Sequence, residues 1–92
     1  MGIEQSINEV WRRIQALEGA EFETKTGKPF TFTVVGNVLR PSRTRYNLSK
    51  ANFARALELW PLDGPGQISP LVRGPAYVWG ILYDQRVRMS DW

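Results

Sequence analysis

The chain contains neither cysteine nor histidine among its 92 residues. Without cysteine it has no disulfide and no thiolate–zinc site, and without histidine it has no imidazole–metal site. The same absences exclude Ser–His–Asp and Cys–His nucleophilic catalysis. Carboxylates are sparse outside the N-terminal third and do not pair at a telling spacing, so a two-carboxylate hydrolase or a magnesium nuclease is not indicated. We therefore expect a protein that is not an enzyme and that holds no metal and no cofactor.

Long apolar runs are also missing. No stretch reaches the roughly 20 apolar residues that a membrane-spanning helix needs. The first ten residues carry Glu4 and Glu9 where a secretory signal requires a basic start and an apolar run. We expect no membrane association and a cytoplasmic protein.

The composition is that of a folded domain. Hydrophobic residues make up 42% of the chain and aromatic residues 12%, which is too much apolar material for a disordered tail. A length of 92 residues fits one domain. We interpret residues 1–92 as a single domain.

Positive charge is concentrated in one block of the chain. The segment from Lys25 to Arg55 contains seven basic residues and no acidic residue, whereas Met1–Thr24 contains five acidic residues and two arginines. The last third is nearly balanced. A positive field over the central block favours an anionic partner.

The patterning predicts an α+β fold: an N-terminal helix, a three-stranded antiparallel β-meander, and two C-terminal helices joined by an ordered Pro/Gly-rich loop. Apolar residues recur at helical spacing over Ser6–Leu17. Short strands are expected at Glu21–Lys25, Phe30–Val35 and Val38–Arg40, with a two-residue turn at Gly36-Asn37.

Two further helices follow in the sequence. One is expected from Lys50 to about Trp60, with Ser49 as its N-cap, and another from Pro75 to about Asp84 or Arg86. The segment 62–74 between them is rich in proline and glycine but carries apolar residues, which indicates an ordered loop packed on the core. The expected core comprises Val10, Ile14, Leu17, Phe30, Phe32, Val34, Leu57, Val78 and Leu82.

The segment Arg40–Asn47 carries the main functional signal. Guanidinium groups pair with phosphate, hydroxyls and amides add phosphate contacts, a tyrosine stacks on bases, and a helix N-terminus favours anions. Our first hypothesis is a non-enzymatic module that binds nucleic acid or another polyanion. The alternative is a solvated loop whose bases pair with acids of the first helix and strand. The candidate residues are Lys28, Arg40, Ser42, Arg43, Thr44, Arg45, Tyr46 and Lys50.

Two other nucleic-acid hypotheses start from the same region. The segment Lys28–Val34 resembles the aromatic strand of an RNA-recognition motif, but Pro29 replaces the glycine and the order of strands and helices differs, so Phe30 and Phe32 are expected in the core. A histidine-independent ribonuclease toxin would use arginine, lysine and Tyr46 on a phosphate. An unshifted tyrosine with a pKa near ~10 is a poor base at neutral pH.

The last predicted helix is apolar nearly all round. Such a helix is buried on more than one side, and a domain this small has little protein to cover it. We expect this helix to form a protein-interaction surface through which the chain makes a homodimer. The interface residues would be Trp79, Tyr83 and Trp92. A third hypothesis is a small-molecule pocket between the Pro/Gly-rich loop and this helix.

Overall fold

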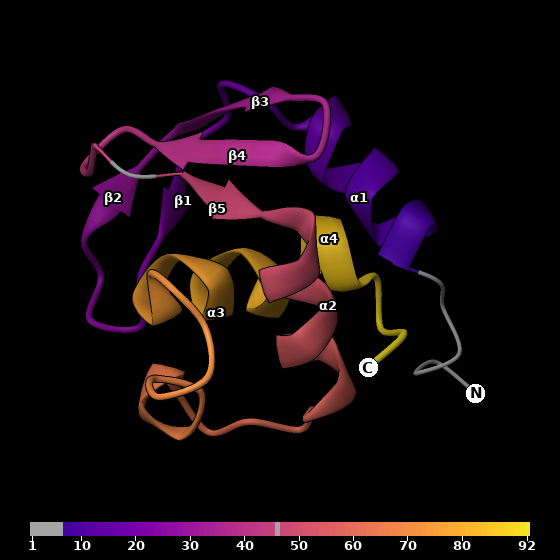
Figure 1. The fold of residues 1–92 in the computed structure, drawn as a ribbon, viewed down its shortest axis with the longest axis vertical. Helices are drawn as coiled ribbons and strands as arrows, with labels where there is room; N and C mark the ends of the chain where they lie inside the picture. Colours follow the sequence, from indigo (N-terminus) through magenta and orange to yellow (C-terminus); the bar gives the residue numbers. More distant parts are fainter. Residues whose placement is uncertain (1–6, 46) are drawn as a thin grey trace.

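The computed structural model describes residues 7–45 and 47–92. The α+β class is confirmed: one helix, small antiparallel sheets, then helices. The sheets lie on one side of the molecule, and the helices cover their inner face (Figure 1). No helix in the described ranges is long and apolar enough to cross a membrane. In chain order the elements are α1 (Ile7–Ala16), β1 (Phe22–Glu23), β2 (Pro29–Phe30), β3 (Phe32–Val35), β4 (Val38–Pro41), β5 (Leu48–Ser49), α2 (Lys50–Glu58), the 3-10 helix η2 (Pro65–Gln67), α3 (Pro75–Tyr83) and α4 (Gln85–Arg88).

The expected three-stranded meander is wrong in its detail. The central strand is interrupted at Thr31, so that β1 pairs with β2 in one sheet and β3, β4 and β5 form another. Thr31 instead forms two hydrogen bonds with Ser42. Its amide donates to Ser42 Oγ (3.0 Å), and its carbonyl accepts from the Ser42 amide (2.8 Å). The predicted turn at Gly36-Asn37 is confirmed, with Val35 opposite Val38 and a positive φ of 59° at Gly36.

The strand β5 is an addition that the sequence did not predict. Leu48 pairs with Leu39 in the sheet, and both side chains are fully buried. The predicted N-cap of α2 follows directly, because the Ser49 hydroxyl accepts a hydrogen bond from the Asn52 amide at 3.3 Å. The chain therefore leaves the sheet and enters the helix without a loop.

The last predicted helix is divided in two. α3 begins at Pro75 as expected but ends at Tyr83, because Asp84 has an extended backbone with ψ 131°. Its carboxylate accepts from the Arg86 amide at 2.9 Å and caps the short α4. The expected end at about Asp84 is therefore correct to within one residue, whereas a continuous helix to Arg86 is not formed.

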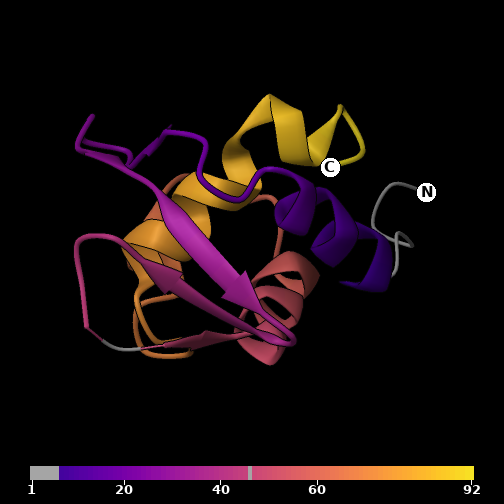
Figure 2. The same cartoon turned by 90° about the horizontal axis from the view of Figure 1, so that it is seen from above.

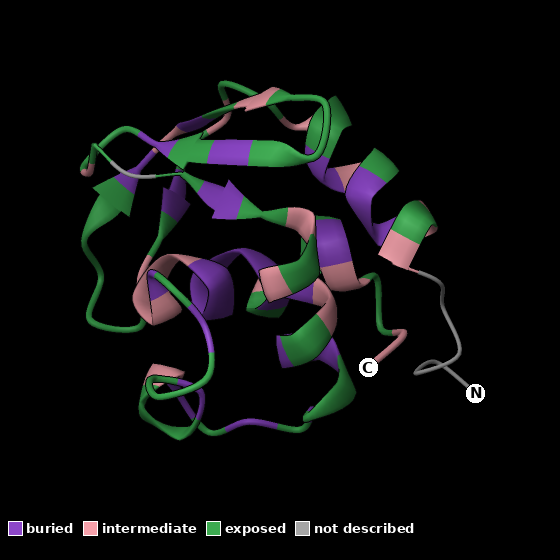
Figure 3. Ribbon diagram, viewed as in Figure 1, coloured by how far each residue is buried: buried purple, intermediate pink, exposed green. Residues whose placement is uncertain are grey.

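α3 is the centre of the helical layer. It contacts α2, α4, η2 and the backbone of β1, and its middle is buried (Figure 3). α1 lies alongside the turn end of the β3–β4 hairpin (Figure 2), where the Trp11 indole donates to the Gly36 carbonyl at 2.8 Å. The loop 62–74 is ordered, as predicted, with Leu62, Ile68 and Val72 buried.

The core confirms most of the expected residues. Seven of the nine are buried, and Leu17 and Val34 are half-buried at its edge. Phe30 and Phe32 belong to the core, as expected, and are 3% and 1% exposed. Their burial excludes the use of these two rings as a stacking platform for bases.

Candidate nucleic-acid interface

The loop that joins β4 to β5 carries Arg43 and Arg45, and we call it the basic loop. It lies at one end of the β3–β4–β5 sheet. It leaves β4 after Pro41 and returns to β5 at Leu48. At its start, the Arg43 guanidinium donates to the Pro29 carbonyl at 3.4 Å. This contact joins the loop to the first residue of β2, which follows Lys28 in the chain.

Arg40 and Asn47 close the base of this loop. The Arg40 Nε donates to Asn47 Oδ1 at 3.1 Å. Both side chains are exposed. The hydrogen bond to the amide uses Nε, which leaves the two terminal nitrogens of Arg40 for contact with a ligand. A guanidinium held in this way is prepared for bidentate contact with a phosphate.

The sequence candidates divide into two groups. Lys50 lies at the opposite end of β4, because its neighbour Ser49 pairs with Val38, the first residue of that strand. β4 is four residues long, so about 10 Å separates the two ends. Tyr46 lies outside the described residues. The other candidates surround the loop end of the sheet: Lys28, Arg40, Ser42, Arg43, Thr44 and Arg45.

The helix start behind the loop is already occupied. The amide of Lys50 donates to the Asn37 carbonyl at 2.8 Å, and the amide of Asn52 donates to Ser49. The Lys50 ammonium donates to Asn8 of α1. The N-terminus of α2 thus contributes little to an anion site at the loop.

Among the described residues, Glu21 and Glu23 form no ion pair with the basic side chains of the loop. In the described part of the chain, the ion pairs that involve the N-terminal acids join Glu9 to Arg12 and Arg13. The remaining pairs are Arg13–Asp91 and Arg86–Asp84. None of these reaches the loop end of the sheet, so the alternative of a loop paired with Glu21 and Glu23 has no support among these residues.

The outer face of the same sheet carries a shallow cavity of about 450 Å³. Its residues alternate with the buried ones along the strands. Thr33 and Val35 are both exposed on this face. The lining residues are Thr33, Val35, Val38, Arg40 and Asn47.

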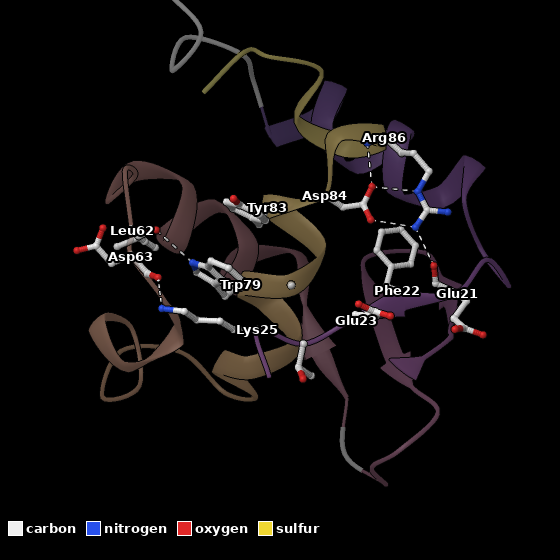
Figure 4. Close-up of a pocket in the computed structure, with 12 residues that line it drawn as sticks. Glu21, Phe22, Glu23, Lys25, Leu62, Asp63, Trp79, Tyr83, Asp84 and Arg86 are labelled. Carbon is white, nitrogen blue, oxygen red and sulfur yellow. Dashed lines mark hydrogen bonds and ion pairs between the residues drawn. The ribbon is translucent and has the colours of Figure 1, made fainter. Parts of the chain in front are cut away.

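A larger cavity of about 720 Å³ lies between β1, the start of the Pro/Gly-rich loop and α3 (Figure 4). This is where a small-molecule pocket was predicted, although β1 and Arg86 were not expected to line it. Six of its twelve lining residues are charged. They are Glu21, Glu23, Lys25, Asp63, Asp84 and Arg86.

The cations of the chain itself already occupy both ends of this larger cavity. The Lys25 ammonium donates to the Asp63 carbonyl at 2.6 Å and lies 5.9 Å from the centroid of the Trp79 ring. At the other end, the Arg86 guanidinium lies 4.3 Å from the Phe22 ring centroid. The Trp79 and Phe22 rings, which would attract a ligand cation, are therefore already in contact with cations of the chain itself.

Arg86 and Asp84 form a tight pair at that second end. Arg86 Nε and one terminal nitrogen each donate to Asp84 at 2.9 Å, and Arg86 also donates to the Glu21 carbonyl at 2.7 Å. The hydrogen bonds from Arg86 lower the pKa of Asp84 against the opposing effect of burial. The same pair raises the pKa of Arg86. This arrangement fixes α4 against β1.

The three residues predicted at an oligomer interface differ in exposure. Trp79 is 6% exposed and donates to the Leu62 carbonyl at 3.3 Å, and Trp92 is half-buried and donates to the Leu82 carbonyl at 2.9 Å. Only Tyr83 of the three is largely exposed, at 51%. A single chain thus covers most of α3, which removes the reason for the homodimer. The homodimer itself stays a prediction.

Residues 7–45 and 47–92 contain no group of three or more acidic side chains placed to hold a metal ion. No family model, no curated protein and no solved structure matches this chain.

Proposed function

We propose that this protein binds nucleic acid through the loop end of its β3–β4–β5 sheet. The observation that carries the proposal is the set of basic side chains at that end, which have no ion pair among the described residues. They are Lys28, Arg40, Arg43 and Arg45.

The basic side chains at this end have no carboxylate partner among the described residues. An internal ion pair would have to be broken before a phosphate could take its place, whereas an unpaired guanidinium exchanges only water and salt ions. The absence of acids from Lys25 to Arg55 keeps the local field positive. These conditions favour a polyanion over a single small anion, because several separate cations act together.

Hydrogen bonds hold the basic loop in place. The Arg40–Asn47 bond closes its base, and Ser42 and Arg43 fix its first residues to Thr31 and Pro29. A loop held in place loses less conformational entropy when it binds. The proposal assigns no catalytic step to these residues.

The test compares two double variants that each remove two positive charges. Arg43→Ala with Arg45→Ala removes charge from the loop, whereas Arg12→Ala with Arg55→Ala removes it from exposed positions on α1 and α2. Fluorescence anisotropy with a labelled oligonucleotide measures the dissociation constant. The loop variant should bind at least about tenfold more weakly, and the helix variant only about two- to threefold more weakly.

Thermal unfolding followed by circular dichroism checks that both variants stay folded. Wild-type affinity in the loop variant would refute the proposal. An equal loss in both variants would show that net charge, and not the loop, governs binding.

A further inference from the structure

We propose that the outer face of the β3–β4–β5 sheet holds unpaired bases, so that the preferred ligand is a single strand and not a duplex. This inference rests on the proposed function and adds the class of nucleic acid and the surface that receives it. The residues concerned line the shallow cavity of about 450 Å³ beside the basic loop.

The first observation is an exposed apolar pair on this face. Val35 of β3 and Val38 of β4 are opposite each other in the sheet, and they are 79% and 37% exposed. Their neighbours Val34 and Leu39 point to the core side. The pair therefore lies on the solvent face, where strand alternation alone would place polar residues.

The second observation is the polar group next to this pair. Arg40 is opposite Thr33 in the register, on the same face as the valines, and its guanidinium is oriented by Asn47. The face thus offers an apolar contact beside hydrogen-bond donors and a hydroxyl. A nucleobase has the same two properties, a flat apolar face and a polar edge.

A duplex makes poor use of such a face. Its base faces are stacked inside the helix, and its outer surface is sugar and phosphate. Phosphate contacts alone need the arginines but gain nothing from Val35 and Val38. An unpaired strand uses both: one base packs on the valines at the turn end of the sheet, and the chain continues over Arg40 to the basic loop at the other end, about 10 Å away.

The edge of the sheet determines where the strand passes. The edge of β3 that does not pair with β4 is covered by the segment after α1. There the Gly19 amide donates to the Phe32 carbonyl at 3.1 Å, and the Glu18 carboxylate accepts from the Val34 amide at 3.0 Å. The carboxylate of Glu18 repels phosphate at this edge. A nucleic-acid strand is therefore directed across β4 and β5 toward Arg43 and Arg45.

A simpler explanation for the two valines is that β-branched residues favour strands. The substitution of both by threonine separates the two explanations, because threonine keeps the branched shape and the strand preference but replaces one methyl group by a hydroxyl, which weakens the apolar contact. Leu71→Thr is the matched control, since Leu71 is 45% exposed in the loop 62–74.

The experiment measures fluorescence anisotropy with an oligonucleotide of about eight nucleotides, a length within the range that small sheet-based binders cover. The oligonucleotide is used both as a single strand and as a duplex. Wild type should bind the single strand at least about tenfold more tightly than the duplex at the same salt. Val35→Thr with Val38→Thr should lose about three- to tenfold in single-strand affinity, as expected when two methyl groups that contact the base are replaced by hydroxyls, with little change for the duplex. Leu71→Thr should leave both unchanged.

Equal affinity of wild type for single strand and duplex would overturn this inference while leaving the proposed function intact. So would a valine variant with an unchanged preference. Absence of binding to either form at low salt would remove the proposed function and this inference together. If the valine variant does not fold, methyl NMR spectra of the wild type decide: the Val35 and Val38 signals should shift with the single strand, and unshifted signals would overturn the inference.

Discussion

Gly80 of α3 lies directly against the backbone of Glu23 in β1. A Cβ atom added at Gly80 would meet the Glu23 carbonyl oxygen at 2.6 Å, closer than real Cβ contacts allow. Both partners are main-chain atoms of packed elements, so neither can rotate away. The absence of a side chain at this one position allows the helix to reach the strand.

Gly80→Ala should therefore destabilise the protein. Overpacking costs about 1–3 kcal/mol, and the better helix propensity of alanine returns at most about 1 kcal/mol. We expect the free energy of unfolding, measured in urea, to fall by up to about 2 kcal/mol. Each kcal/mol lost lowers Tm by about 4–8 °C.

Gly66→Ala is the control for this substitution, because a Cβ at Gly66 would have no heavy atom within 4 Å. It should leave stability almost unchanged. Equal stability of wild type and Gly80→Ala would contradict the close approach of α3 to β1.

Arg13 connects α1 to the C-terminal segment. One terminal nitrogen donates to the Val87 carbonyl at 2.8 Å and the other to Asp91 at 2.7 Å, and the side chain is 14% exposed. Arg13→Gln would leave these acceptors without their donor, and hydrogen bonds to charged groups contribute about 1.5–3 kcal/mol. We expect a loss of about that size in urea unfolding.

The neighbouring Arg12 provides the comparison for that measurement. Its side chain is 69% exposed and pairs only with Glu9, and exposed pairs contribute little. Arg12→Gln should change the midpoint of unfolding far less than Arg13→Gln. Similar losses in the two variants would contradict the role assigned to the Arg13 contacts.

Asp84 gives the protein a pH-dependent contribution to stability. Its pKa is lowered in the folded state, chiefly by the hydrogen bonds from Arg86. The unfolded chain therefore binds a proton at higher pH than the folded chain. The contribution is present above the ordinary aspartate pKa of ~3.9 and is lost as the pH falls through the lower folded value.

Asp84→Asn tests this linkage, because asparagine keeps the ability to cap α4 but lacks the charge. Wild type should be more stable than the variant at neutral pH, and the difference should shrink below pH ~4. The measurement is urea unfolding across this pH range. A difference that stays constant down to low pH would show that the charge of Asp84 does not stabilise the fold.

The sequence predicted the elements that have strong local signals. Ser49 before an amphipathic run correctly located the start of α2, and Gly36-Asn37 correctly located the hairpin turn. Such signals depend only on neighbours along the chain. The helix end was expected at about Asp84 or Arg86, but the short helix α4 that Asp84 caps was not predicted, because four residues are too few to show a periodicity.

Features that depend on distant parts of the chain were predicted less well. The strand β5 is two residues long, too short for a periodicity, and its existence depends on pairing with Leu39. The covering of α3 by its own chain was not predicted, because it depends on Leu62 and its loop folding over Trp79. The site on the outer sheet face also needed Asn47, which the return of the chain to β5 brings beside Arg40.

The salt dependence of oligonucleotide binding by the wild-type protein tests the central claim most directly. For single strands, the logarithm of affinity falls linearly with the logarithm of salt, with a slope of about −0.7 per phosphate contact. Contacts from Lys28, Arg40, Arg43 and Arg45 would give a slope of about −2.8, or about a fiftyfold loss of affinity between ~50 and ~200 mM salt. We predict a slope between about −2 and −3 by anisotropy. An affinity that does not change with salt, or no binding at the lowest salt, would contradict the account.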